Sequence, residues 1–448
     1  MRPVPDAANP YLAGVHTPMS EERTLQDLPI DGAIPQALNG RYLRMGPNPM
    51  RADPVKYHWF AGDGMIHGIR IEGGKALWYR NRWIRSERVS EALGEPRVPG
   101  PRNSFDTVNT NVVQFAGRTL GLVEAGSTPV EIGETLETLR YTDFSGTLHG
   151  SFAAHPHVDP LTGEMHAVCY DVSRRRAIRY IVIAPDGKVR REVSVPVRHG
   201  PMIHDCAFTQ RFAIIFDLPV TFSLLAAVSR YNFPYRWRPA HEARVGLLPR
   251  EGGAEDIIWV PVNPCYIFHA VNSHDTADGR VILDVVVHDQ MFSRINTGPD
   301  SLSCALERWI IDPRARKVER LTIDATAQEF PRIDERRLGQ TYRFAYTMGM
   351  TGWFLGTCLY KHDLETGQRR HHDFGLGRHP CEFVFVPAHA RAGEDEGWLV
   401  GFVIDVNAEA TDLVILNARD FEGAAQASIR IPHIVPPGFH GNWLQNAQ

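Results

Sequence analysis

The feature that most constrains the fold of this chain is a series of short β-branched runs separated by tight turn signals. Asp-Gly and Thr-Gly pairs between such runs are typical of β-hairpins. Turn signals of this kind fall at Gly117-Arg118, Asp159–Gly163, Asp186-Gly187, Ala277–Gly279 and Glu365–Gly367. Few segments between them have convincing helical periodicity. The sequence therefore predicts an all-β protein built as a sandwich, a barrel or a propeller.

The length of the chain favours the propeller. With 448 residues and no composition break typical of a linker, residues 1–448 are predicted to form a single domain. The strands of a propeller surround a central axis, so residues far apart in the sequence can meet there. The repeat is too weak at the level of single residues to give the number of blades.

Composition excludes some classes of protein. The net charge is -4, and without a basic excess to neutralise phosphates the chain is not expected to bind nucleic acid. The N-terminal residues do not form a signal peptide, and no apolar run approaches the roughly 18 residues of a spanning helix. Six cysteines without a CxxC spacing indicate reduced thiols. These features predict a cytoplasmic location.

Four histidines stand in unusual local sequences: His155 in AAHPHVDPLTGE, His204 in PMIHDCAF, His269 in CYIFHAVN and His440 in FHGNW. Only a closed tertiary fold could bring residues so far apart together. Four neutral imidazoles around one centre suit a divalent first-row metal. The chain has 20 histidines, however, and a single histidine on a strand is more often an ordinary core or surface residue.

Other histidines of the chain are alternatives to this set. His157 shares a strand face with His155 under period-two alternation, so it remains an alternative ligand, and His166 also lies nearby. His371, His372 and His379 fall in a polar, turn-like run and are predicted to be exposed. HExxH, GxSxG and Walker A motifs are absent from the sequence, so hydrolase and NTPase functions have no motif behind them.

Three glutamates lie within apolar or aromatic sequence: Glu124 in LGLVEAG, Glu329 in QEFPRID and Glu382 in HPCEFVFV. A carboxylate is costly to bury unless it is paired, and a ligating imidazole needs an acceptor on its second nitrogen. These glutamates are therefore candidates to orient the histidines. The alternative is that each is a strand-edge residue that faces water.

Together these residues resemble the carotenoid cleavage oxygenase family. The resemblance begins at NGRYLRMGPN (39–48) and ends at HGNW (440–443), so it covers nearly the whole chain. Further matching blocks follow in the expected order: WFAGDGMIHG (59–68), NTNVV (109–113), AHPHVDPLTGE (154–164), MIHD (202–205), EFPRID (329–334) and YRFAY (342–346). Two blocks, RNRWIRSE (80–87) and FPYRW (233–237), look like those of apocarotenoid-cleaving members.

The resemblance implies a seven-bladed β-propeller with a loop and helix cap over a central metal site. It implies that His155, His204, His269 and His440 ligate a non-haem Fe(II), and that Glu124, Glu329 and Glu382 orient the last three of them respectively. Thr110 falls where the family places a residue near an open iron position. The implied reaction uses O2 as co-substrate, without an organic cofactor, to cleave a conjugated double bond of a carotenoid or apocarotenoid into two carbonyl products.

The substrate is less constrained. Family members that cleave 4-hydroxystilbenes commonly carry a lysine just before the first of these glutamates, and here that residue is Val123. Valine cannot hydrogen-bond a phenol, which favours an apolar polyene. A stilbene or isoeugenol-like aromatic alkene remains the alternative. Isomerisation with ester cleavage and a metal-free binding propeller are two further hypotheses.

The segment Val220–Val228 (VTFSLLAAV) is apolar without strand alternation. It is interpreted as a short helix or a buried loop. In the family, apolar loops at the tunnel mouth dip into membranes, so Phe222, Leu224 and Leu225 are candidates for a peripheral membrane contact.

Overall fold

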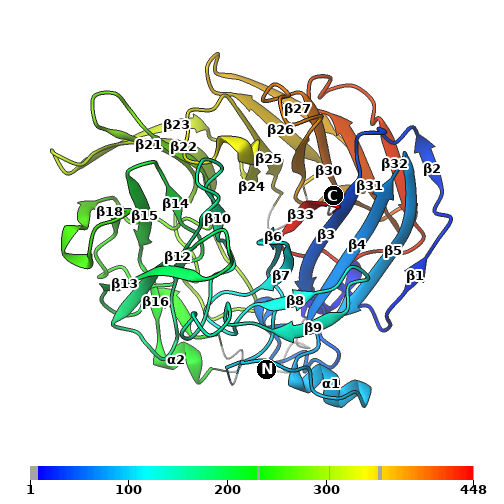
Figure 1. Ribbon diagram of the computed structural model, residues 1–448, viewed down its shortest axis with the longest axis horizontal. Coiled ribbons are helices and arrows are strands. Elements are labelled where there is room, and N and C mark those ends of the chain that lie inside the picture. The colour runs from blue at the N-terminus through cyan, green and yellow to red at the C-terminus, as the bar shows by residue number, and fades with distance from the viewer. Residues whose placement is uncertain (1–8, 104, 230–232, 302, 352–355, 447–448) are drawn as a thin grey trace, which may run out of the picture.

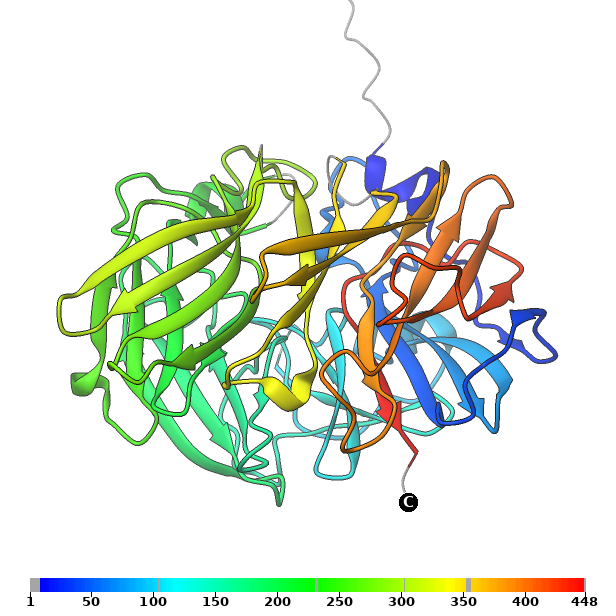
Figure 2. The same cartoon turned by 90° about the horizontal axis from the view of Figure 1, so that it is seen from above.

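The computed structural model describes residues 9–103, 105–229, 233–301, 303–351 and 356–446. Seven sheets of four to six strands are arranged around one axis, with an additional two-stranded sheet at the periphery. Figure 1 looks along this axis, and Figure 2 shows the ring from its side. The predicted all-β propeller is confirmed, and the number of blades is seven.

Most blades are four-stranded meanders in which sequential strands pair antiparallel. The first strand of each lies nearest the axis. From the axis outwards, two of these blades consist of β6 (Asn111–Phe115), β7 (Arg118–Leu122), β8 (Val130–Ile132) and β9 (Thr138–Tyr141), and of β10 (His157–Val158), β11 (Met165–Cys169), β12 (Ala177–Ile183) and β13 (Val189–Pro196). The next two consist of β14 (Ala207–Phe208), β15 (Phe212–Asp217), β18 (Arg244–Pro249) and β19 (Ile258–Pro261), and of β20 (Ala270–Asp275), β21 (Val281–His288), β22 (Cys304–Asp312) and β23 (Lys317–Asp324). The fifth consists of β24 (Gln328–Arg332), β25 (Phe344–Gly349), β26 (Cys358–Asp363) and β27 (Gln368–Asp373).

The remaining two blades close the ring, because each combines strands from both ends of the chain. One blade pairs the C-terminal strand with N-terminal strands, in the order β33 (Gly441–Gln445), β3 (Gly40–Pro47), β4 (Gly64–Glu72), β5 (Lys75–Trp83), β1 (Thr24–Leu25). The other pairs an N-terminal strand with C-terminal strands, in the order β2 (Ile30–Gly32), β32 (Ala427–Ile431), β31 (Ala410–Asn417), β30 (Gly397–Asp405), with β28 (Arg378–Pro380) and β29 (Val384–Pro387) both against β30.

The predicted turn signals coincide with hairpins. Gly187 joins β12 to β13 with φ 81°, and Gly367 joins β26 to β27 with φ 71°. A residue with a Cβ is strained in this left-handed region, which explains the choice of glycine. Turn chemistry in the sequence therefore fixes where these strands begin and end.

The core consists of apolar layers between neighbouring blades. In β31, Leu413 and Ile415 belong to the cluster that faces the β3 blade, while Val414 and Leu416 belong to the cluster that faces the β25 blade. Successive residues of a strand point to opposite faces. Both faces of this blade are therefore buried, and its strand reads as a continuous apolar run instead of an alternating one.

Helices are few and short. Those in the described residues are α1 (Glu87–Leu93), α2 (Leu224–Ala227) and five 3-10 turns, namely η1 (Pro10–Leu12), η2 (Gly14–His16), η3 (Trp59–Ala61), η4 (Ala254–Asp256) and η5 (Glu335–Arg337). Within the described ranges, no helix is long and apolar enough to cross a membrane.

Two local predictions need correction. His371 and His372 lie on the edge strand β27, and His379 lies on β28, not in turns. Only His371 is exposed; His372 and His379 are half-buried, and each hydrogen-bonds a backbone carbonyl. An edge strand that faces water on one side tolerates polar side chains, and a polar strand sequence is easily read as a turn.

Residues 220–228 are neither one helix nor one buried loop. Val220–Phe222 forms β16, which pairs with β17 (Tyr235–Trp237), and a single helical turn, α2, follows. Val220 is buried, whereas Leu224, Leu225 and Val228 are 68%, 64% and 73% exposed. The segment therefore presents apolar side chains to the surface. All six cysteines are free, as predicted; three are buried and three are half-buried.

Candidate metal centre

Each blade has one predicted residue at or near the end of its innermost strand that faces the cluster. Thr110, His269 and His440 directly precede β6, β20 and β33, and His155 and His204 lie within three residues of β10 and β14. Glu329 is the second residue of β24, and Glu382 lies between β28 and β29. Seven short sequences thus meet at one level of the axis.

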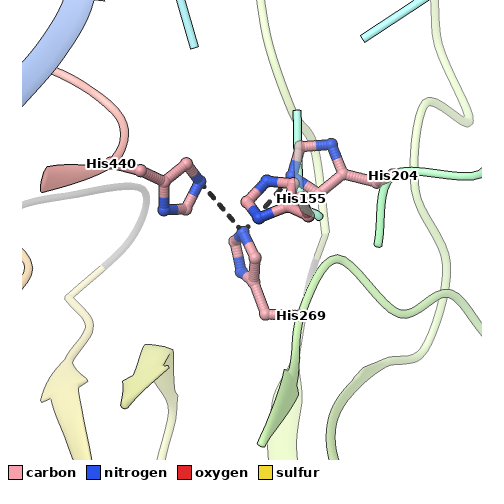
Figure 3. A group of neighbouring side chains, drawn as sticks. All are labelled: His155, His204, His269 and His440. Carbon is pink, nitrogen blue, oxygen red and sulfur yellow. Dashed lines mark hydrogen bonds between the residues drawn. The ribbon is translucent and has the colours of Figure 1, made fainter. Parts of the chain in front are cut away.

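The four histidines converge with their ring nitrogens inward (Figure 3). One nitrogen from each lies within 4.8 Å of the others, and all four residues are buried. His269 is central: its Nε2 lies 3.2 Å from Nε2 of His204 and 3.2 Å from Nε2 of His440. The structure brings together the set named from the sequence. His157, the alternative ligand, pairs with Asp205 instead.

Each predicted glutamate lies against the outer nitrogen of one imidazole. Nδ1 of His204 donates to Glu124 at 3.1 Å, Nδ1 of His269 to Glu329 at 2.6 Å, and Nδ1 of His440 to Glu382 at 3.1 Å. A carboxylate only accepts, so these bonds place the proton on Nδ1. The Nε2 lone pairs are left to face one another.

Lone pairs that face one another repel unless a cation lies between them. The buried Nε2 of His155 also has no hydrogen-bond partner. With metal–nitrogen bonds of about 2.1 Å, ligands at right angles stand about 3.0 Å apart and tetrahedral ligands about 3.4 Å apart. The observed 3.2 Å separations lie between these values. The donor set fits a divalent first-row metal ion.

The charges of the outer carboxylates are fixed by their partners. Burial opposes the ionisation of Glu382, but His440, Arg332 and the Gly441 N–H outweigh it and lower its pKa to about 2. Burial likewise opposes the ionisation of Glu329, yet His269 and His288 hold the pKa of this carboxyl far below its usual value. Both groups are therefore anions that accept a hydrogen bond from Nδ1 of the adjacent imidazole.

A further partner holds each carboxylate, and these three residues were not predicted. The hydroxyl of Tyr170 donates to Glu124 at 2.8 Å, Nε2 of His288 donates to Glu329 at 2.7 Å, and Arg332 lies 3.4 Å from Glu382. Arg332 lies within the EFPRID block, so the motif offered a signal for it. Tyr170 and His288 stand in ordinary strand sequence, which gives no such signal.

An apolar cavity of about 850 Å³ opens onto the cluster. His204, His269 and His440 form part of its wall, together with Thr110 and Val123. The lining also includes a group of aromatic side chains: Trp59, Phe60, Phe233, Phe268, Phe330 and Phe439. Such a cavity suits an apolar small molecule and would place it beside three of the four histidines.

Comparison with known proteins identifies the family. A sequence model described as retinal pigment epithelial membrane protein matches residues 16–445. A carotenoid cleavage oxygenase of Mycobacterium tuberculosis is 41% identical, over 98% of both chains. The chain belongs to the carotenoid cleavage oxygenase family. Another family member, carotenoid 9,10(9',10')-cleavage dioxygenase 1 of Arabidopsis thaliana, is 32% identical over 99% of this chain and 91% of its own.

Solved structures of the carotenoid cleavage oxygenase family show the same fold. The lignostilbene dioxygenase of Pseudomonas brassicacearum superposes with a TM-score of 0.88 at 27% identity, over 99% of this chain and all of its own. A cobalt-substituted Synechocystis apocarotenoid oxygenase gives 0.85 at 26% identity, over 96% and 98%. These two relatives differ in the substrate that their names state.

Proposed function

We propose that this chain is a non-haem Fe(II)-dependent dioxygenase that cleaves a conjugated carbon–carbon double bond of a carotenoid or apocarotenoid with O2. The double bond is broken, each of its carbons gains one oxygen atom, and two carbonyl products leave. The observation that carries the proposal is the meeting of four inward-facing imidazoles with an apolar cavity of about 850 Å³.

The chain's own residues would hold the metal ion, orient the imidazoles and exclude water. His155, His204, His269 and His440 would hold the iron, which when bound supplies the redox chemistry that O2 requires. Glu124, Glu329 and Glu382 keep the proton on Nδ1 of their histidines, so that each Nε2 stays a lone-pair donor. Thr110 lines the same cavity as the cluster, where it would face the alkene. The aromatic wall excludes water that would compete for the open side of the cluster.

The cavity favours a long apolar substrate. Its volume of about 850 Å³ lies in the upper part of the roughly 300–1,000 Å³ range of small-molecule sites, which leaves room for a chain longer than a two-ring alkene. Val123 lines the wall and offers no hydrogen bond to a phenol. The second candidate is cleavage of a stilbene or isoeugenol-like alkene, which the TM-score of 0.88 to a lignostilbene dioxygenase supports.

A substrate panel tests both candidates. Apoprotein would be loaded anaerobically with Fe(II), then given 18O2 with an apocarotenal, a carotene, resveratrol and isoeugenol, and the products identified by mass spectrometry. We expect paired, labelled carbonyls from a polyene. Cleavage of the aromatic alkenes alone would move the substrate assignment to the second candidate. No product from iron-loaded protein would contradict the proposed reaction.

We also propose that this protein is cytoplasmic and that it contacts a membrane peripherally through residues 220–228. Leu224, Leu225 and Val228 are exposed, and Phe222 and Ala227 of the same segment line the cavity. A lipophilic substrate would thus pass from lipid into the cavity without crossing water.

Sedimentation with liposomes tests this contact. Leu224→Ser with Leu225→Ser should reduce the bound fraction without lowering thermal stability. Leu376→Ser is the matched control, because Leu376 is 93% exposed but lies between β27 and β28, away from the cavity lining. Equal binding of the double variant and the wild type would remove the proposal.

A further inference from the structure

A second cavity, of about 370 Å³, lies on the other side of the four-histidine cluster. His269 and His440 line both cavities, whereas His155 and Glu382 line only the second one among the lining residues described. The cluster is therefore a partition between two spaces. We call the second space the axial channel.

The two spaces extend in opposite directions along the axis. Near the cluster, the first cavity is lined by residues that precede the inner strands, such as Asn109, Phe268 and Phe439. The axial channel is lined by residues farther along the same inner strands, including Gln114 near the end of β6 and Gln445 at the end of β33. Figure 2 shows β33 running toward the face where the C-terminal end leaves the ring, opposite η1 and η2. The axial channel follows the inner strands to that face.

The chemistry of the axial channel suits a hydrated cation. Its described lining includes four carboxylates and two guanidinium groups: Asp205, Asp334, Glu335, Glu382, Arg332 and Arg336. The rest of the lining is largely apolar, with Val113, Phe385 and Trp443 among it, but the excess of carboxylates gives the channel a net negative charge, which concentrates cations. The aromatic wall of the substrate cavity would instead strip water from a dication without replacing it, which is costly.

Two side chains that line the axial channel are hydrogen-bonded to each other. Arg332 of β24 donates to Asn442 Oδ1 at 2.5 Å and to Glu335 Oε1 at 2.6 Å. Asn442 of β33 donates to the Val112 carbonyl of β6 at 2.8 Å. Inner strands of three blades are thus linked by a polar crossbar. Both crossbar residues are half-buried, while Gln114 and Gln445 at the outer end are exposed.

We infer that the axial channel is the path by which the divalent metal ion reaches and leaves the four-histidine cluster, with Arg332 and Asn442 as its gate. The inference rests on the proposed metal centre. It separates two tasks: the apolar cavity serves the substrate, and the axial channel serves the ion. Metal exchange then continues when the substrate cavity is filled.

Exchange kinetics of Co(II) test the path without an activity assay. Cobalt would be loaded into apoprotein, and its release to excess EDTA followed by absorbance. Gln114→Trp narrows the outer end and should slow both loading and release severalfold. Gln368→Trp, at an exposed position on the outer strand β27, is the matched control and should exchange at the wild-type rate. Gln445→Trp provides a second plug should Gln114→Trp not fold.

Two further variants should not slow cobalt exchange. Asn442→Ala removes the crossbar and should accelerate release severalfold. Val172→Trp narrows the rim of the substrate cavity, where Val172 is 36% exposed; it should raise KM for a polyene and leave cobalt exchange unchanged. Wild-type exchange rates in both plug variants, or slow exchange in Val172→Trp, would overturn the axial path. Wild-type protein that binds no cobalt at the histidines would instead overturn the metal centre itself.

Discussion

Three of the four inward-facing histidines are supported differently from the fourth. Side-chain carboxylates orient His204, His269 and His440. Within the described part of the chain, no carboxylate hydrogen-bonds the ring of His155. The backbone next to His155 is held instead, because the Asn111 side chain donates a hydrogen bond to the carbonyl of Ala154 at 2.9 Å. Burial, followed by the neighbouring imidazoles, places the pKa of His155 well below its usual value.

Two independent arrangements therefore build the centre. On the carboxylate-backed side, hydrogen bonds set both the tautomer and the orientation of each ring. On the His155 side, the path of the main chain places the ring, and burial keeps it neutral. Damage to the two sides should therefore produce distinct results.

Removal of a central ligand should have the largest effect. His269→Ala deletes the imidazole that contacts both His204 and His440, so we expect loss of bound iron and of activity together. Metal content by mass spectrometry and product formation measure this. His371→Ala, at an exposed site on β27, is the control. An iron-loaded, active His269→Ala protein would contradict the ligand assignment.

Substitution of the glutamates that orient the imidazoles should lower activity by different amounts. Glu329→Gln keeps the shape and removes the charge, so we expect most iron to remain and activity to fall about 10–100-fold. Glu124→Gln should cost less, because the Glu124 side chain is 14% exposed against 1% for Glu329 and its bond to the imidazole is longer. Steady-state rates and iron content of both variants test the order. Equal activities of Glu329→Gln and wild type would remove Glu329 from the centre.

Loss of an outer partner should have a smaller effect. Tyr170→Phe deletes one of the two bonds that hold Glu124, and turnover should fall severalfold with iron retained. Tyr235→Phe removes a hydroxyl from the same cavity wall and is the matched control. If both variants lose activity equally, the cause is the cavity surface and not the orientation of Glu124.

Acid should weaken the fold outside the centre, independently of metal. Burial lowers the pKa of His362 from 6.5 to about 4, so its neutral form is stabilised in the folded state. This stability is present above the unfolded pKa of 6.5 and is lost as the pH falls from 6.5 toward 4. Urea unfolding of apoprotein at several pH values should show a shallower acid loss for His362→Gln. An unchanged pH dependence would exclude His362 as a contributor.

Much of this architecture could be predicted from local sequence, and the failures have physical causes. Turn glycines such as Gly187 define hairpins through their backbone conformation. The ligand histidines stand in distinctive sequence blocks because each block must both place an imidazole in the cluster and begin an inner strand a few residues later. Helix α1 was missed, although Ser86 caps its first turn and Gly94 ends it with φ 69°. Tyr170 and His288 could not be found, since packing alone gives them their roles.

The way the ring closes has a consequence for how the protein is made. β33 completes the first blade and directly follows His440, so a nascent chain still emerging from the ribosome lacks both the last imidazole and the strand that positions it. Six blades can stack during translation, but the site remains incomplete until synthesis passes residue 445. Assembly of the centre is therefore a late step of folding, because it requires β33 to pair with β3.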